Sequence, residues 1–282
     1  MTLFSWMRRA ALAGLCAWAA LASANPGASD KPYVPVRGQM GKDVMWIPTP
    51  KGLIDKMLTA AKVTSSDQVY DLGAGDGVIA ITAARAFGAQ AVGIEYNPKM
   101  ADYARRMVQE AGVSDKVRII TGDIFKEDFS SATVVTLYLL PELNMQLRPT
   151  LLRMKPGTRV VSHAFGMGDW EPDEILTHDN ARGYLWVVPA AVEGEWMLTG
   201  MQGGPVRLSL RQVLQKIGGS LTRGNTSQPL LGARLRGQEL FFQFVTADRQ
   251  VHTFSGEVSG GLISGTVSST EGVMAIVQAR KL

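Results

Sequence analysis

The chain has 282 residues, of which 46% are hydrophobic and 19% charged, with ordinary numbers of glycine (30) and proline (13). This composition excludes a wholly disordered chain, a collagen and a multi-pass membrane protein. The formal net charge is only +4, from 29 basic and 25 acidic residues, so we expect no nucleic-acid partner.

The first 24 residues have the pattern of an export signal. Arg8 and Arg9 precede an apolar stretch over residues 10–21, and a small-residue cleavage site follows at 22–24. We expect cleavage before Asn25, an exported protein of the periplasm or cell envelope, and no stable membrane insertion afterwards. The alternative is an uncleaved anchor, although the stretch is shorter than the about 20 residues that a bilayer span needs.

The cysteine and histidine content predicts no metal site. Cys16 is the only cysteine and lies within the export signal, so the mature chain would have no thiol and no disulfide. The three histidines, His163, His178 and His252, show no metal-ligand spacing.

From about residue 50 to 190, strand-like apolar runs alternate with amphipathic segments, which predicts a parallel α/β sheet. We expect strands over residues 69–72, 91–95, 117–121, 134–140, 159–165 and 184–189. Helices are expected over residues 80–87, 98–111 and 142–154.

After about residue 195 the pattern becomes all-β, with short alternating runs separated by Gly-rich turns. We expect strands over residues 196–200, 206–215, 220–223, 234–236, 239–245, 251–257, 262–267 and 273–278, which form a β-meander or small barrel. The net charge changes from −3 over residues 25–195 to +5 over residues 196–282. The predicted organisation is an export signal at 1–24, an α/β domain at 25–193 and a β domain at 194–282.

A Gly-rich turn follows the first expected strand, in the sequence D-L-G-A-G-D-G over residues 71–77. Glycines permit the sharp turn and the close backbone approach that a ligand at a helix N-terminus requires. The spacing G-x-G-x-G differs from the dinucleotide pattern, and Asp71 and Asp76 would be unfavourable beside a diphosphate but favourable beside a cation. A nucleoside cofactor or simple tight packing remain as alternatives.

This segment resembles motif I of the class I S-adenosylmethionine-dependent methyltransferases. Two acids follow in the order of that family: Glu95 in V-G-I-E-Y-N-P and Asp123 in T-G-D-I-F. The resemblance implies that Asp71 lies near the methionine amino group, that Glu95 binds both ribose hydroxyls and that Asp123 accepts from the adenine amino group. It also implies S-adenosyl-L-methionine as cofactor and a Rossmann-like fold with a mostly parallel seven-stranded sheet.

Two further segments are similar to the small seven-strand protein-lysine methyltransferases. V-M-W-I-P-T-P at 44–50 is similar to their V-P-T-P segment, where Thr49 would contact the cofactor carboxylate, and L-Y-L-L-P-E-L-N at 137–144 is close to their L-L-P element. The residues that the resemblance assigns to the cofactor are Thr49, Asp71, Gly73, Ala74, Gly75, Gly77, Glu95, Tyr96, Asp123 and Ile124.

The acceptor is less defined, because the chain lacks the N-P-P-Tyr motif of many amino-nitrogen methyltransferases. A protein lysine amine is the first hypothesis, and a small or lipid-linked envelope molecule is the second. The rival to an enzyme is a non-catalytic module that binds the cofactor and a partner, since an exported enzyme would need a supply of a cytoplasmic cofactor. The oligomeric state is not predicted.

Tyr138 and Glu142 are the candidate catalytic residues, because a lysine would dock at the carboxyl end of the fourth strand. Tyr138 could instead pack under the cofactor, and Glu142 could stabilise a helix N-terminus. His163 is interpreted as a hydrogen-bonded structural residue, with an approach to the acceptor as the alternative. Trp46, beside the expected pocket, is a candidate for ligand binding.

Overall fold

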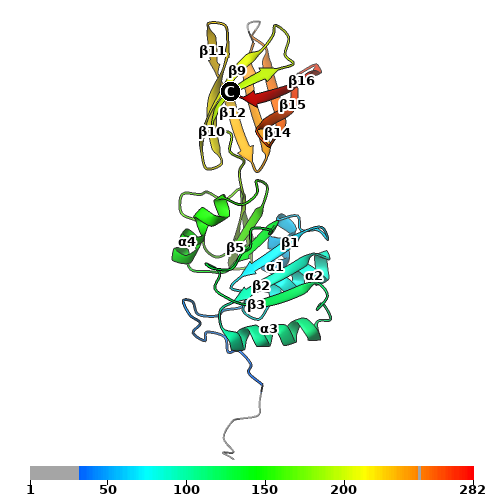
Figure 1. Ribbon diagram of the computed structural model, residues 1–282, viewed down its shortest axis with the longest axis vertical. Helices are drawn as coiled ribbons and strands as arrows, with labels where there is room; N and C mark the ends of the chain where they lie inside the picture. The colour runs from blue at the N-terminus through cyan, green and yellow to red at the C-terminus, as the bar shows by residue number, and fades with distance from the viewer. Residues whose placement is uncertain (1–31, 247–248) are drawn as a thin grey trace, which may run out of the picture. The chain divides into compact units, whose positions relative to one another are not determined.

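The computed structural model describes residues 32–246 and 249–282 (Figure 1). The expected export signal at 1–24 lies outside the described residues. Within them, no helix has both the length and the apolar character needed to cross a membrane.

The first sheet has seven strands in the order β3-β2-β1-β4-β5-β7-β6. The pairs from β3 to β5 are parallel, whereas β7 runs antiparallel to both β5 and β6. The predicted mostly parallel seven-stranded sheet is therefore confirmed. The strands are β1 (Gln68–Leu72), β2 (Gln90–Glu95), β3 (Val117–Thr121), β4 (Val134–Leu137), β5 (Arg159–His163), β6 (Glu174–His178) and β7 (Ala181–Val187).

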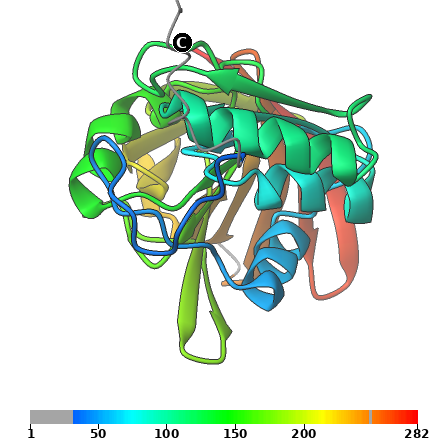
Figure 2. The ribbon, with the colours of Figure 1, turned by 90° about the horizontal axis from the view of Figure 1, so that it is seen from below.

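Helices cover both faces of this sheet, because its strands carry apolar side chains on both sides. One core packs α1, α2 and α3 on residues such as Val69 and Val134, and the other packs α4 on residues such as Leu72 and Leu137. Figure 2 shows α1, α2 and α3 grouped together and α4 apart from them. The helices are α1 (Lys51–Ala60), α2 (Val78–Phe87), α3 (Pro98–Glu110) and α4 (Pro141–Leu152).

Two expected strands are shorter in the structure than the apolar runs that predicted them. β4 ends at Leu137 instead of residue 140, since Pro141 begins α4 and proline suits the first turn of a helix. β5 ends at His163 because Ala164 has a φ of 66°, which no strand tolerates.

Two elements of this domain, α1 and β6, are missing from the expected elements, although Leu53, Ile54, Met57 and Leu58 of α1 have the spacing of an amphipathic helix. The residue before α1, Pro50, provides no side-chain cap, so the usual start signal is absent. Only Leu176 of β6 is buried, and one buried residue produces no alternating pattern.

The second sheet has nine antiparallel strands in the order β11-β10-β9-β8-β16-β15-β14-β13-β12. The first strand β8 pairs with the last strand β16, so the meander curls into a nearly closed barrel with its seam between β11 and β12. The predicted meander or barrel is confirmed, with β11 as an additional strand. The strands are β8 (Gly194–Thr199), β9 (Val206–Val213), β10 (Lys216–Arg223), β11 (Thr226–Pro229), β12 (Leu231–Arg236), β13 (Glu239–Val245), β14 (Val251–Ser259), β15 (Leu262–Ser269) and β16 (Gly272–Lys281).

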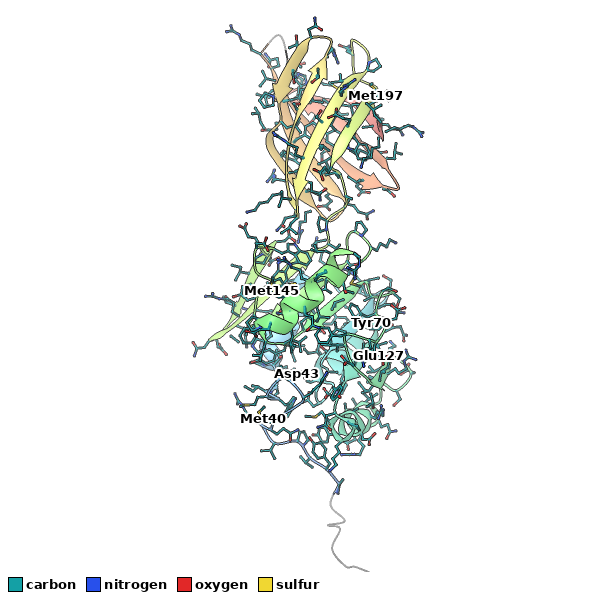
Figure 3. All side chains as sticks on the ribbon, turned by 60° about the vertical axis from the view of Figure 1, so that its left-hand side comes forward. Met40, Asp43, Tyr70, Glu127, Met145 and Met197 are labelled. Carbon is teal, nitrogen blue, oxygen red and sulfur yellow. The ribbon has the colours of Figure 1, made fainter. Side chains whose placement is uncertain are left out.

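The barrel has its own core, which includes the fully buried rings of Trp196, Phe242 and Phe254. Figure 3 shows side chains on both surfaces of its strands, with Met197 labelled on β8. The predicted boundary between residues 193 and 194 falls where the segment after β7 ends and β8 begins. Independent folding of the two parts stays a prediction.

Candidate active site

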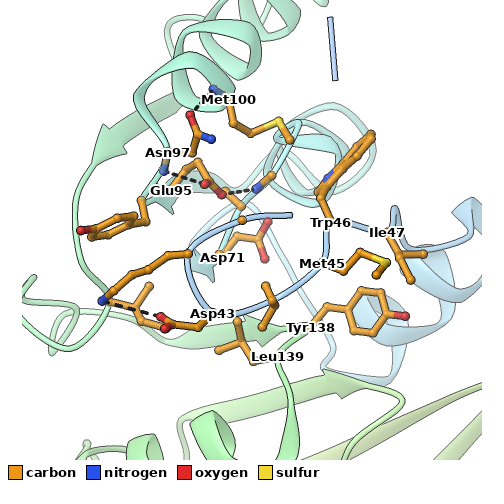
Figure 4. A pocket seen from close by; sticks show the side chains of 18 of the residues that line it. Asp43, Met45, Trp46, Ile47, Asp71, Glu95, Asn97, Met100, Tyr138 and Leu139 are labelled. Atoms are coloured by element: carbon orange, nitrogen blue, oxygen red, sulfur yellow. Dashed lines mark hydrogen bonds and ion pairs between the residues drawn. The ribbon is translucent and has the colours of Figure 1, made fainter. Parts of the chain in front are cut away.

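A cavity of about 240 Å³ lies at the carboxyl ends of β1, β2 and β4, where the ligands of parallel α/β sheets bind (Figure 4). Ten of the twelve residues proposed from the sequence line it: Thr49, Asp71, Gly73, Ala74, Gly75, Glu95, Tyr96, Asp123, Ile124 and Tyr138. Gly77 and Glu142 are not among the lining residues. The order of strands in the sheet brings these scattered residues together.

The glycine turn between β1 and α2 has a backbone that other residues rarely adopt. Gly73, Gly75 and Gly77 have φ values of 82°, 55° and 79°. A Cβ on Gly75 would lie 2.5 Å from Nε1 of Trp46, so the glycine lets this indole lie against the turn. Gly77 is the N-cap residue of α2 and faces Ala104, so its place is in the packing of the turn and not in the cavity wall.

Glu95 links the end of β2 to this turn. The backbone N–H of Gly75 donates to Oε2 at 2.9 Å, and that of Asn97 donates to Oε1 at 2.9 Å. Each carboxylate oxygen has a second lone-pair direction, so the side chain can accept two further hydrogen bonds. Burial raises the pKa of the Glu95 carboxyl.

Asp71 is the most deeply buried acid of the cavity, with 3% of its surface exposed. The Thr136 hydroxyl donates to Oδ1 at 2.6 Å. Burial raises the pKa of the Asp71 carboxyl to about 7 against the effect of this hydrogen bond, and the charges of Asp76 and Glu95 add to the rise. Three carboxyl groups therefore share a poorly solvated region that a cation would stabilise.

Among residues 32–246 and 249–282, no group of three or more His, Cys, Asp or Glu side chains is arranged to hold a metal ion. Figure 4 shows Asp71, Glu95 and Trp46 around the cavity. The arrangement suits an organic cation with an apolar surface that the indole can contact.

The segment before α1 covers the cavity, since residues 41–49 and Gln39 line it. Nζ of Lys42 lies 3.3 Å from Oδ2 of Asp123 and 4.5 Å from the centre of the Tyr96 ring. The hydrogen bond from the backbone N–H of Phe125 lowers the pKa of the Asp123 carboxyl, and the hydrogen bond and charge of Lys42 lower it further. The sequence did not indicate Lys42, which is 81 residues from Asp123 and belongs to no motif.

A second cavity of about 650 Å³ shares the wall residues Ile47, Pro48 and Tyr138 with the first. His163 lines it, and its ring centre lies 3.8 Å from that of Tyr138. Nδ1 of His163 is 3.0 Å from Oγ1 of Thr49, within hydrogen-bonding distance. Burial lowers the pKa of His163 to about 4, so the imidazole is neutral at pH 7.

The structure shows where three candidate residues from the sequence, Thr49, Tyr138 and Glu142, lie relative to the two cavities. Thr49 lines the first cavity but directs its hydroxyl group to His163, a contact that the sequence did not predict. Tyr138 stands between the two cavities. Glu142 is exposed in the first turn of α4 and lines neither cavity, which suits the helix-stabilising alternative.

Comparison with known proteins finds matches to this part of the chain. A family model described as the ANTKMT methyltransferase domain matches residues 71–174. A protein-lysine N-methyltransferase of Saccharolobus islandicus is 43% identical over 151 residues, which cover 51% of this chain and 94% of the relative.

One further relative is named as a lysine methyltransferase, and one similar solved structure is named as an RNA methyltransferase. An adenine nucleotide translocase lysine N-methyltransferase of Mus musculus is 30% identical over 122 residues, which cover 43% of this chain and 53% of the relative. The crystal structure of an RNA methyltransferase from Salinibacter ruber, in complex with S-adenosyl-L-homocysteine, is 50% identical with a TM-score of 0.51. That match covers 52% of this chain and 96% of the other.

Proposed function

Because this chain belongs to the class I S-adenosylmethionine-dependent methyltransferases, and to their protein-lysine group, we propose that its methyl acceptor is the side-chain amine of a protein lysine. The chain is an S-adenosylmethionine-dependent methyltransferase. Some relatives are named as lysine methyltransferases and one as an RNA methyltransferase, so these names alone do not identify the acceptor. The geometry of the site supports lysine.

The residues of the first cavity fit the cofactor. S-adenosylmethionine supplies a methyl group on a positively charged sulfur, which an amine can attack in line. The carboxyl groups of Asp71, Asp76 and Glu95 suit the cationic half of this molecule, and Glu95 keeps two accepting positions for the ribose hydroxyls. Asp123 also lines the cavity, and it would accept from the adenine amino group after release from Lys42.

The second cavity is the observation that carries the proposed acceptor. It borders the cofactor cavity at Tyr138, Ile47 and Pro48. An amine that reaches past these side chains would contact the methyl group directly, and such positioning provides the alignment that methyl transfer needs. The close, tilted ring pair of Tyr138 and His163 and the neutral charge of His163 give this wall the character that a neutral amine prefers.

The pKa of His163 decides its part in the reaction. Moving a proton from a lysine of pKa about 10.4 to an imidazole of pKa about 4 would cost on the order of 9 kcal/mol, so His163 is no general base for lysine. Instead the amine loses its proton to water. Two arginines, Arg37 and Arg182, and one acid, Asp179, line the second cavity, and this excess of positive charge favours the neutral amine. With Nδ1–H donating to Thr49, Nε2 of His163 can accept an amine hydrogen and orient the nitrogen lone pair.

The test is a methyl-transfer assay with labelled cofactor on an extract of the cell envelope. We expect label in protein, with mono-, di- or trimethyllysine after hydrolysis, and about 30-fold less label with the Glu95→Ala variant as control at a cofactor concentration below its Kd. Label in RNA, in lipid or in a small molecule would reject the lysine acceptor. The variant His163→Phe keeps an aromatic ring beside Tyr138, so we expect about tenfold lower kcat with unchanged affinity for S-adenosyl-L-homocysteine.

We also propose that the enzyme is exported. Residues 1–24 contain the basic pair Arg8 and Arg9, then an apolar stretch and a cleavage site of small residues, which is the pattern of an export signal. Mass spectrometry of protein recovered from cells should then find Asn25 as its first residue. An intact Met1 on membrane-bound protein would support the uncleaved anchor instead.

A further inference from the structure

We propose that the nine-stranded barrel binds an amphiphile, a small molecule with an apolar body and one anionic group, in a cavity at one end of its interior. The cavity has a volume of about 540 Å³, within the range of small-molecule sites. This site is separate from the two cavities of the methyltransferase sheet. The described residues that line it are Met201, Gln202, Val206, Leu221, Arg223, Thr226, Gln228, Phe244, Thr246, His252, Val267, Met274 and Ala275.

The lining comes from one end of the barrel, because it unites strand ends that lie together in an antiparallel meander. It includes the first residue of β9 and the last residue of β10, Val206 and Arg223. Successive side chains of a strand point to opposite faces, so Arg223 lies on the same face of β10 as the buried Leu221 and is exposed at the end of the strand. Seven of the nine strands contribute in this way, which makes the cavity a feature of the closed barrel and not of one hairpin.

The distribution of side-chain size explains why space remains at this end. The middle of the interior is filled by the stacked rings of Phe242 and Phe254, with centres 4.7 Å apart, and by Trp196. Farther along, β15 and β16 place the small side chains of Val267 and Ala275 at opposing positions. Small side chains on neighbouring strands cannot fill the width of the barrel, so an apolar space remains.

The opening of the cavity is adaptable and apolar. Met201 and the exposed Met274 lie at its rim, and methionine adjusts its shape to irregular apolar ligands. Deeper inside, Phe244 and the buried His252 form a stacked pair with centres 5.5 Å apart. These groups provide contacts for an alkyl chain or a flat ring.

Arg223 determines the charge that the ligand should carry. Among the described residues of the lining it is the one permanently charged side chain, and no carboxylate accompanies it. Its guanidinium lies beside Gly203, whose φ of 80° and missing side chain leave room for it. Residues 196–282 carry nine basic and four acidic side chains, so the surrounding field also favours an anion.

The test uses the full chain and a fluorescent fatty acid, dansyl-aminoundecanoate. We expect saturable binding at one site and displacement by dodecanoate, with dodecyltrimethylammonium weaker by at least about tenfold, because like charge would face Arg223. Absence of saturable binding would overturn the proposal. Equal competition by the anion and the cation would overturn the assignment of an anionic ligand.

Two pairs of variants locate the site. Val267→Trp fills the cavity and should abolish binding, whereas Val273→Trp, at a position 69% exposed, should not change it. Arg223→Gln should weaken binding of the probe about threefold to fivefold, as expected for loss of an exposed ion pair, and added salt should remove this difference from the wild type. Arg207→Gln, at another exposed position, is the control and should leave binding unchanged. Unchanged circular dichroism and S-adenosyl-L-homocysteine affinity verify folding, and equal probe binding by Val267→Trp and Val273→Trp would refute the site.

Discussion

Replacing Asp71 by Asn should stabilise the free protein and at the same time weaken its cofactor binding. In the folded protein the pKa of Asp71 is raised to about 7 from an ordinary value of 3.8, chiefly by burial. The stabilising effect of the neutral form is complete below the unfolded pKa and is lost as the pH rises through about 7. Ionised Asp71 therefore destabilises the free protein at pH 8, and a neutral amide removes that cost.

The magnitude follows from the difference of about three pKa units. Asp71→Asn should raise the free energy of unfolding by about 4 kcal/mol at pH 8 and by about 2 kcal/mol at pH 5. The Thr136 hydroxyl can still donate to the amide oxygen, so its hydrogen bond is retained. Binding should suffer because the amide has no charge to attract the cationic half of the cofactor.

Urea unfolding of the full chain without cofactor, at pH 5 and pH 8, measures the first effect. Calorimetry with S-adenosyl-L-homocysteine measures the second. Asp115→Asn, at an exposed position, is the matched control and should change neither quantity by more than about 0.5 kcal/mol. If Asp71→Asn were no more stable than the wild type at pH 8, the argument that burial disfavours the charged carboxylate would be wrong.

Three further predictions concern the same domain. Glu95→Ala removes both accepting oxygens and should weaken cofactor binding about 30-fold, or about 2 kcal/mol, by calorimetry; an unchanged affinity would contradict its ribose role. Gly75→Ala should displace Trp46 and lower the affinity at least about tenfold, whereas Gly166→Ala, with open space around its Cβ position, should not. A chain that ends at Ala191 should stay folded and bind the cofactor with less than about tenfold loss, and insolubility would show that the barrel belongs to the catalytic core.

The cofactor side of the site could be inferred from the sequence because its determinants are local. Asp71, Glu95 and Asp123 each follow an apolar run, and parallel strands bring their carboxyl ends to one edge of the sheet. The positive φ values at Gly73 and Gly75 are required by the turn itself, so glycine spacing predicts them. Each of these features depends only on the residues of one strand end or one turn, so the local sequence is enough to predict it.

The contacts between distant segments could not be inferred in this way. Thr49 and His163 are 114 residues apart, Lys42 and Asp123 are 81 apart, and neither pair leaves a repeated pattern in the chain. The space inside the barrel is equally non-local, because it depends on the pairing of β8 with β16 and on small side chains such as Ala275 that meet only after closure. Hydrophobic periodicity reports which face of one element is buried, whereas a cavity or an ion pair depends on which elements become neighbours, and that is decided by packing of the whole chain.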